Sequence, residues 1–173
     1  GSASNGVRIG AEYPSNYYFN GYIAGNRIVK GTAVYTSNFT PSTTPPTAIT
    51  NTSLLLNFTN AGIIDSTSKN DLQTVGDVQV STSVVKYGSG SIKFDGTGDY
   101  LYTVNPNTNV LMNMGNGNFT IEFWMYCVDD STYSGSTFLS PSPNTNLTCS
   151  LTSGSSNARL PYLEYGGSGT TFP

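Results

Sequence analysis

Residues Phe119–Cys127 alternate between two kinds of side chain with a period of two, the pattern of a β-strand with one buried face. The odd positions are all apolar, whereas the even positions mix aromatic and polar side chains. This alternation predicts a sandwich strand whose odd positions face the core and whose even positions line a half-exposed groove. If the odd face is fully buried, Phe123→Ala should cost about 3–5 kcal/mol.

Composition extends the β prediction to the whole chain. Ser, Thr, Asn and Gly make up 82 of the 173 residues. The first three compete with helical backbone hydrogen bonds through their side chains, and Gly adds an entropic cost, so a helical bundle is excluded. The 12 Tyr, 8 Phe and one Trp provide aromatic surface that needs burial, which argues against disorder. We therefore expect an all-β antiparallel sandwich with a polar surface.

Shorter apolar or alternating runs predict the remaining strands. One pair is separated by Gly96-Thr97-Gly98, whose glycines permit positive φ, and this pattern predicts a β-hairpin. The expected strands are Val7–Gly10, Tyr18–Ile28, Leu54–Phe58, Ser91–Asp95 and Asp99–Val104, with weaker ones near 136–140, 147–151 and 160–165.

Charge and residue usage exclude several function classes. The formal net charge is −3 and no cluster of Lys and Arg occurs, so nucleic acid is not an expected partner. The longest apolar run, Phe123–Val128, is too short for a membrane span. Histidine is absent, which excludes Ser-His-Asp or Cys-His triads and His-ligated zinc. Cys127 and Cys149 are 22 residues apart and are either a disulfide or two separate buried thiols.

A Pro-rich segment at 41–47 is expected to be a linker, because proline cannot donate to a β-ladder and favours an extended chain. It divides the chain into residues 1–40 and 48–173. Forty residues cannot bury a stable core alone, so the first part must pack on the second or belong to something else.

Two sets of motifs stand on either side of the Pro-rich segment. Residues 54–126 contain LLLNF at 54–58, IDS at 64–66, YGSGSIKFDGTGDYL at 87–101 and NFTIEFWM at 118–125. Residues 8–40 contain IGA at 9–11, YFNGYI at 18–23, RIVKGTAVY at 27–35 and NFTP at 38–41. The set at 54–126 resembles the first half of the concanavalin A-like, laminin G-like jelly-roll module, and the set at 8–40 resembles its end. Such segments look like those in repetitive structural proteins of bacteriophages.

The order of these motifs is inverted, and the middle of the family pattern is missing. The resemblance therefore implies C-terminal strands of one module at 1–40, a linker at 41–47 and the N-terminal part of the next module at 48–173. Three arrangements are open: a circularly permuted domain, completion by strands of a neighbouring chain, or a fragment of a longer repeat protein. The fragment is favoured, with the two parts on opposite sides of the linker.

The resemblance implies a non-enzymatic structural and adhesion module of an extracellular particle, such as a phage fibre or capsid-surface protein. The expected partners are other virion or fibre subunits, with an oligomeric assembly, and cell-surface glycans. The alternative is a secreted carbohydrate-binding module attached to a larger enzyme. Catalysis by the chain itself is not expected, because a glycosidase needs two carboxylates and Glu122 has no second acid within its strand.

Aromatic rings stack on the apolar faces of sugars. The predicted glycan-binding residues are Tyr100, Tyr102, Trp124, Tyr126 and Tyr133, and ordinary sandwich packing is the alternative role for each of them.

Structural Ca²⁺ is the expected cofactor, because the family often holds this ion in loops that offer oxygen ligands. The predicted ligands are Asp65, Asp95 and Asp99, with Asp77 as a further candidate. The alternative for Asp95 and Asp99 is that they cap the turn around the glycines.

Overall fold

The computed structural model describes residues 6–12, 17–59, 62–104, 111, 114, 116–128, 136–141, 147–151, 161–165 and 168–171. Every regular element among them is a strand, and none is a helix that could cross a membrane. The strands are β1 (Val7–Ile9), β2 (Asn20–Lys30), β3 (Thr52–Leu56), β4 (Asp71–Val75), β5 (Gln79–Ser81), β6 (Ser91–Asp95), β7 (Tyr100–Val104), β8 (Phe119–Cys127), β9 (Ser136–Pro141), β10 (Leu147–Leu151), β11 (Pro161–Tyr165) and β12 (Ser168–Thr171).

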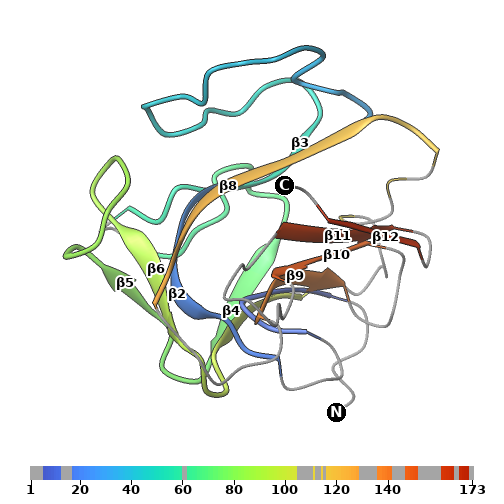
Figure 1. Ribbon diagram of the computed structural model, residues 1–173. Helices are drawn as coiled ribbons and strands as arrows, with labels where there is room; N and C mark the ends of the chain where they lie inside the picture. The colour runs from blue at the N-terminus through green and yellow to red at the C-terminus, as the bar shows by residue number, and fades with distance from the viewer. Residues whose placement is uncertain are drawn as a thin grey trace.

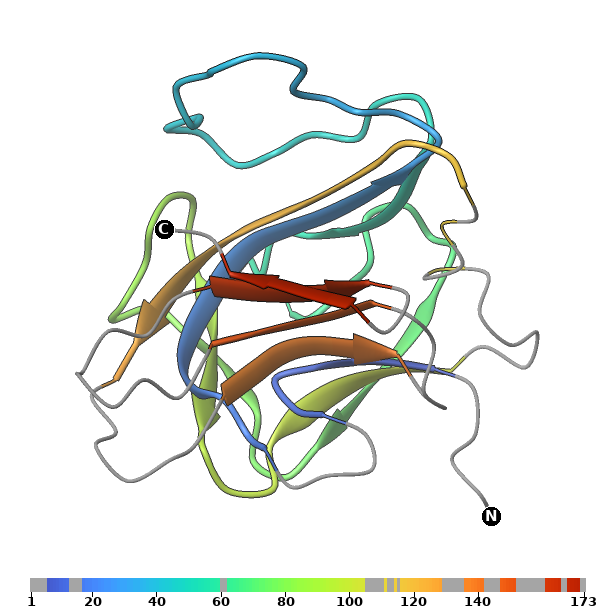
Figure 2. The same ribbon diagram turned by 45° about the vertical axis from the view of Figure 1, so that its right-hand side comes forward.

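The strands form two antiparallel sheets that pack face to face (Figures 1 and 2). The seven-stranded sheet has the order β12-β11-β10-β9-β1-β7-β4. The five-stranded sheet has the order β3-β2-β6-β5, with β8 paired to β2. The predicted all-β sandwich is therefore confirmed, and its form is compatible with a jelly roll.

The long strand β2 is the centre of the five-stranded sheet. Strand β8 pairs with it from Gly21 to Lys30. On the opposite edge of β2, β6 pairs with residues 20–23 and β3 with residues 26–29. A bulge interrupts the β2–β8 ladder between Ala24 and Arg27, where Gly25 has a φ of 59°.

One apolar core lies between the sheets. Its most buried members include Ile9, Leu101 and Leu139 from the seven-stranded sheet and Ile23 and Phe94 from the five-stranded sheet, each at most 1% exposed. The odd positions of β8 pack against this core, as predicted. They are only half-buried, however, so the expectation of a fully buried face for Phe123 is wrong.

Segments before and after the Pro-rich segment pair within the same sheets. Strand β1 pairs with β7 and β9, and β2 pairs with β6 and β8. The expectation that the two parts lie on opposite sides of a linker is therefore wrong. Residues 31–51 instead form a loop between β2 and β3, which arches above β2 and β8 in both views (Figures 1 and 2). Assignment of the two parts to modules of a particular family stays a prediction.

The predicted hairpin at Gly96–Gly98 is also wrong. Strand β6 belongs to the five-stranded sheet and β7 to the seven-stranded sheet, so the glycine turn carries the chain across the sandwich. Gly96 and Gly98 have φ values of 86° and 77°, so the turn does need glycine. A second crossover joins β4 to β5 through Gly76 and Asp77. Two neighbouring arches therefore connect the sheets.

Candidate functional site

A groove of about 590 Å³ lies between β8 and the loop that follows β2. Both faces of β8 line it: Glu122 and Trp124 from the outer face, and Ile121, Phe123 and Met125 from the inner face. The loop contributes aromatic and proline side chains, namely Tyr35, Phe39, Pro41, Pro45 and Pro46. Gly25 and Arg27 of β2 line it as well, so the groove lies over the paired strands β2 and β8.

The charged groups of this groove are Arg27 and Glu122, which form an ion pair across the β2–β8 ladder. The Nε and Nη2 atoms of Arg27 both donate to Oε1 of Glu122. The hydroxyl of Tyr35 donates to Oε2 at 2.6 Å. Arg27 is only 7% exposed, so the pair neutralises a charge that would be costly to bury alone.

The carboxylate of Glu122 raises the pKa of two nearby tyrosines. The hydrogen bond to Glu122 raises the pKa of Tyr35, and burial and the negative charge of Glu122 raise it further. Burial, together with the charges of Glu122 and Tyr35, raises the pKa of Tyr87 to about 12. Both phenols therefore stay protonated at neutral pH and can donate hydrogen bonds.

The ion pair also anchors the Pro-rich loop. Nη1 of Arg27 donates to the carbonyl of Thr47 at 2.8 Å, and Nδ2 of Asn57 donates to the carbonyl of Pro46 at 3.2 Å. Within the loop, the rings of Tyr35 and Phe39 stack with centroids 3.7 Å apart. The segment predicted to be a linker is therefore a loop fixed to the sheet below it.

A second, smaller hollow of about 270 Å³ opens on the outer face of the same sheet. Tyr22, Trp124 and Tyr126 line it, together with Lys86. The rings of Tyr22 and Tyr126 lie 6.2 Å apart, and Tyr126 is 60% exposed. Nζ of Lys86 lies 4.0 Å from the centre of the Trp124 ring, a cation–π contact.

The five predicted glycan-binding residues do not form one cluster in the described part of the structure. Trp124 and Tyr126 lie together on the outer face of β8, as the alternation predicted. Tyr100 and Tyr102 are on β7 in the other sheet, and Arg8 lies over the Tyr100 ring at 4.5 Å. Tyr133 lies outside the described residues.

Sequence reasoning missed Tyr22 and Lys86. The alternation of β2 could have indicated Tyr22, because this strand reads as β-type throughout. Its pairing with Tyr126, which brings the rings together, has no local sequence pattern.

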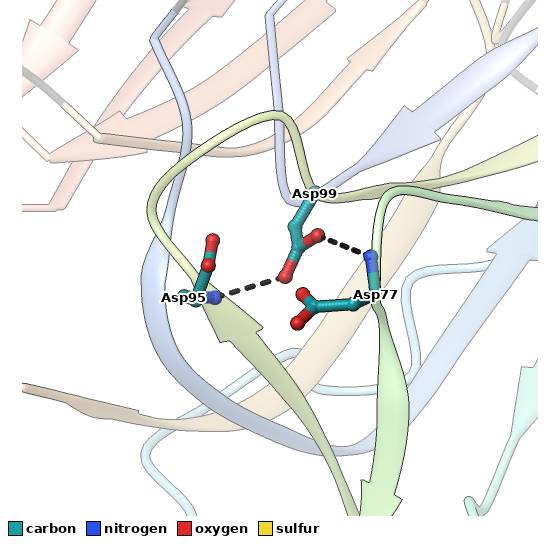
Figure 3. Close-up of side chains that lie close together, drawn as sticks. All are labelled: Asp77, Asp95 and Asp99. Carbon is teal, nitrogen blue, oxygen red and sulfur yellow. Dashed lines mark hydrogen bonds between the residues drawn. The ribbon is translucent and has the colours of Figure 1, made fainter.

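Of the predicted metal ligands, Asp95 and Asp99 lie together with Asp77 where the two arches meet (Figure 3). One oxygen from each carboxylate lies within 4.8 Å of the other two. Oδ1 of Asp99 accepts a hydrogen bond from the amide of Asp77 at 2.9 Å, and Oδ2 accepts one from the amide of Asp95 at 3.0 Å. Asp99 therefore caps both turns, the alternative role considered for it.

Asp99 is 2% exposed. Burial raises its pKa, the two backbone donors oppose this rise, and the charges of Asp95 and Asp77 add to it. Three carboxylates that repel one another offer the hard oxygen donors that Ca²⁺ prefers, so the donor set fits this ion.

Asp65 lies elsewhere, in the loop after β3, and is not part of this cluster. Its Oδ1 accepts hydrogen bonds from the amides of Leu55 and Thr67. Its Oδ2 accepts from the amides of Lys69 and Asn70 and from the side chains of Thr67 and Asn70. Burial alone would raise its pKa, but these hydrogen bonds hold the pKa below its usual value. The carboxylate is thus occupied in organising its own loop, and its role as a metal ligand stays a prediction.

Cys127 and Cys149 are separate thiols, which decides between the two alternatives left open by their spacing. Burial raises the pKa of Cys149 to about 12, so this thiol is unreactive.

Comparisons with protein families, with curated proteins and with solved structures found no match for this chain.

Proposed function

We propose that the chain is a non-enzymatic structural and adhesion module of an extracellular particle, a bacteriophage fibre or capsid-surface protein, that binds glycans. The resemblance to jelly-roll modules of phage structural proteins supports the proposed place of the chain in a bacteriophage particle. The sandwich architecture is compatible with it, although folds of this kind carry many functions, so the argument for binding must come from a site.

The observation that carries the proposal is the aromatic cluster of Tyr22, Trp124 and Tyr126 on the outer face of β2 and β8. Aromatic rings around an open hollow can stack on the apolar face of a sugar, and 270 Å³ suits a short stretch of glycan. Lys86 covers Trp124, and its ammonium group is free to move aside and donate to sugar hydroxyls or to a carboxylate.

Binding without hydrolysis is supported by the state of Glu122. One of its oxygens is paired with the guanidinium of Arg27 and the other accepts a hydrogen bond from Tyr35, so both oxygens are already engaged within the fold. A glycosidase needs one carboxyl group that carries a proton at working pH. Glu122 is poorly suited to that role.

A glycan array followed by titration of the best ligand tests the proposal. Tyr126→Ala should lower affinity at least about fivefold, because it removes a stacking ring worth around 1 kcal/mol. Tyr17→Ala is the matched control, since Tyr17 is 41% exposed and lies outside the lining of the hollow.

Tyr100→Ala tests which of the two sheets carries the binding site. If the outer face of the five-stranded sheet is the site, this change in β7 leaves affinity unaltered. An equal loss for Tyr100→Ala and Tyr126→Ala would contradict the location, and no binding to any glycan would remove the glycan from the proposal.

A further inference from the structure

The aromatic hollow on the outer face of β2 and β8 carries a positive charge. Lys86 is the one charged residue among the described residues that line it, and its ammonium group lies over the Trp124 ring. We propose that the glycan bound in this hollow is acidic, and that Lys86 pairs with a carboxylate or sulfate group on a sugar that stacks on the neighbouring tyrosines. This inference rests on the proposed function and adds the chemical class of the ligand.

The charge of Lys86 is not neutralised within the described part of the chain. Its side chain is exposed, and its ammonium group forms no ion pair with any described residue. The cation–π contact with Trp124 leaves the N–H groups that point away from the ring for another acceptor. Lys86 therefore differs from Arg27 of the same sheet, whose charge is balanced by Glu122.

A second lysine extends the positive surface. In the register of the sheet, Tyr22 lies opposite Tyr126 on β8 and opposite Lys93 on β6. Side chains that lie opposite one another in antiparallel strands share a face, with Cβ atoms about 5 Å apart. The exposed Lys93 is therefore next to Tyr22 on the face that carries the hollow. An acidic sugar that stacks on Tyr22 is near two ammonium groups.

Two acidic side chains of this face, Asp95 and Glu122, are engaged elsewhere. Asp95 lies two positions after Lys93, in the carboxylate cluster of Figure 3, and its Oδ1 accepts a hydrogen bond from the amide of Thr97 at 2.7 Å. Glu122 lies beyond the bulge and is paired with Arg27. Neither carboxylate lines the hollow. The positive charge is a local feature, because the whole chain has a formal net charge of −3.

The loop that carries Lys86 is fixed to the sheet. It joins β5 to β6, and at its base Oγ of Ser91 donates to the carbonyl of Val84. The hydroxyl end of Tyr87 lies against Gly25 of β2, where a Cβ would overlap it. The backbone under Lys86 therefore has a defined place before a ligand arrives, and binding costs little further ordering of the loop.

Pairs of glycans that differ in one kind of acidic group test the inference. Three pairs are added to the array: 3′-sialyllactose with its methyl ester, tri-galacturonic acid with its methyl ester, and 3′-sulfolactose with lactose. The protein is then titrated with each ligand that binds, and the fluorescence of Trp124, the single tryptophan of the chain, reports binding. In at least one pair the acidic member should bind at least about fivefold more tightly than the neutral one. This preference should shrink between about 50 mM and about 500 mM salt, because exposed charges are screened.

Three lysine variants locate the acidic group. Lys86→Gln should lower affinity for the acidic member at least about fivefold, and affinity for the neutral member should be at least as high as before, because the Trp124 ring is uncovered. Lys93→Gln should weaken the acidic ligand by a smaller factor, about twofold, since Lys93 is beside the hollow and does not line it. Lys69→Gln is the matched control. It removes the same charge from an exposed lysine in the loop after β3, outside the lining of the hollow, and should leave both affinities unaltered.

The inference is overturned if acid and ester bind equally, or if Lys86→Gln leaves the preference for the acid intact. It is also overturned if Lys86→Gln and Lys69→Gln weaken the acid equally, because net charge then explains the preference. Glycan binding with no preference for acids leaves the proposed function standing, whereas no binding to any glycan removes the glycan from that function. If Lys86 carries the preference, the pair with the larger ratio shows whether the acidic group is a carboxylate or a sulfate.

Discussion

Two buried aspartates differ in what surrounds their carboxylates. Asp65 accepts six hydrogen bonds and has a lowered pKa, whereas Asp99 accepts two, lies beside two further carboxylates and has a raised pKa. The number of donors on the charged form decides the direction, because burial opposes ionisation at both positions. Burial alone would therefore predict a raised pKa for Asp65, whereas its pKa is lowered.

Replacing Asp65 by Asn should destabilise the fold by about 2–3 kcal/mol at neutral pH, because several donors lose a charged acceptor. The lowered pKa means that Asp65 contributes stability above its unfolded pKa of about 3.9, and that this contribution is lost as the pH falls through the folded pKa. Denaturant melts between pH 7 and 2 should therefore show a smaller acid-induced loss for Asp65→Asn than for the parent.

Asp71→Asn is the matched control, since it removes the same formal charge from an exposed position on β4. If this control lowers stability as much as Asp65→Asn does, the effect comes from net charge and not from the hydrogen bonds of the loop.

The half-burial of Phe123 lowers the expected cost of truncating it. Phe123→Ala should cost about 1–2 kcal/mol, whereas Phe94→Ala, at a position only 1% exposed, should cost about 3–5 kcal/mol. Urea melts of the two variants measure the difference. Equal losses would mean that the edge of β8 is as tightly packed as the centre of the sheet.

At the scale of elements, the positions of strands were predictable and their pairing was not. Alternation located β8 with its correct inner face, and short apolar runs located β1, β3, β6 and β7. The turn at Gly96–Gly98 has the same residues whether it joins two strands of one sheet or crosses between sheets. In the folded molecule Asp99 accepts a hydrogen bond from the amide of Asp77 on the other arch, and no local sequence pattern indicates this contact.

The elements that sequence reasoning missed have weak patterns. Strand β4 is mostly exposed, so its side chains carry little apolar alternation, and β5 has only three residues. The ion pair of Arg27 and Glu122 joins residues 95 apart, and only the β2–β8 ladder makes it visible. Candidate-site residues on one strand were therefore predictable, whereas clusters formed by two strands were not.

The loop between β2 and β3 depends on that ion pair. Glu122→Gln should destabilise the fold by about 3 kcal/mol, because it leaves the buried guanidinium of Arg27 without a counter-charge. It should also move the pKa of Tyr35 down toward its ordinary value, since the hydrogen bond to Glu122 is the main cause of the rise. Denaturant melts and a ¹³C NMR titration of the tyrosine ring carbons measure the two effects.

Tyr35→Phe is the comparison for this variant. It removes one hydrogen bond but keeps the charge pair, so its cost should be only about 1 kcal/mol. If both variants cost the same, the ion pair adds nothing beyond the tyrosine contact.

At the scale of the whole molecule, the cluster of Asp77, Asp95 and Asp99 lies on two neighbouring arches that connect the sheets. A cation bound there should raise the melting temperature, because it binds only the folded state and relieves the repulsion. The gain from added Ca²⁺ should be modest and should grow as the pH rises through the raised pKa of Asp99, since protons compete with the ion.

Differential scanning calorimetry with and without chelator checks this prediction. Asp95→Asn should abolish the response to calcium, and the exposed control Asp71→Asn should keep it. Melts that are unchanged by both chelator and calcium would assign the cluster to turn capping alone.

Strands β1 and β2 pair with strands far along the chain, so they must wait during synthesis until these partners have been made. The amide of Val7 bonds to Thr103, 96 residues later, and Arg27 meets Glu122 after a similar interval. At about 5–20 residues per second, a ribosome needs roughly 5–20 s to deliver these partners. Until then β1 lacks its partner β7 and β2 lacks its partner β8, so the sandwich can close only after residue 127 has been synthesised, and the unpaired strand edges are open to aggregation before that.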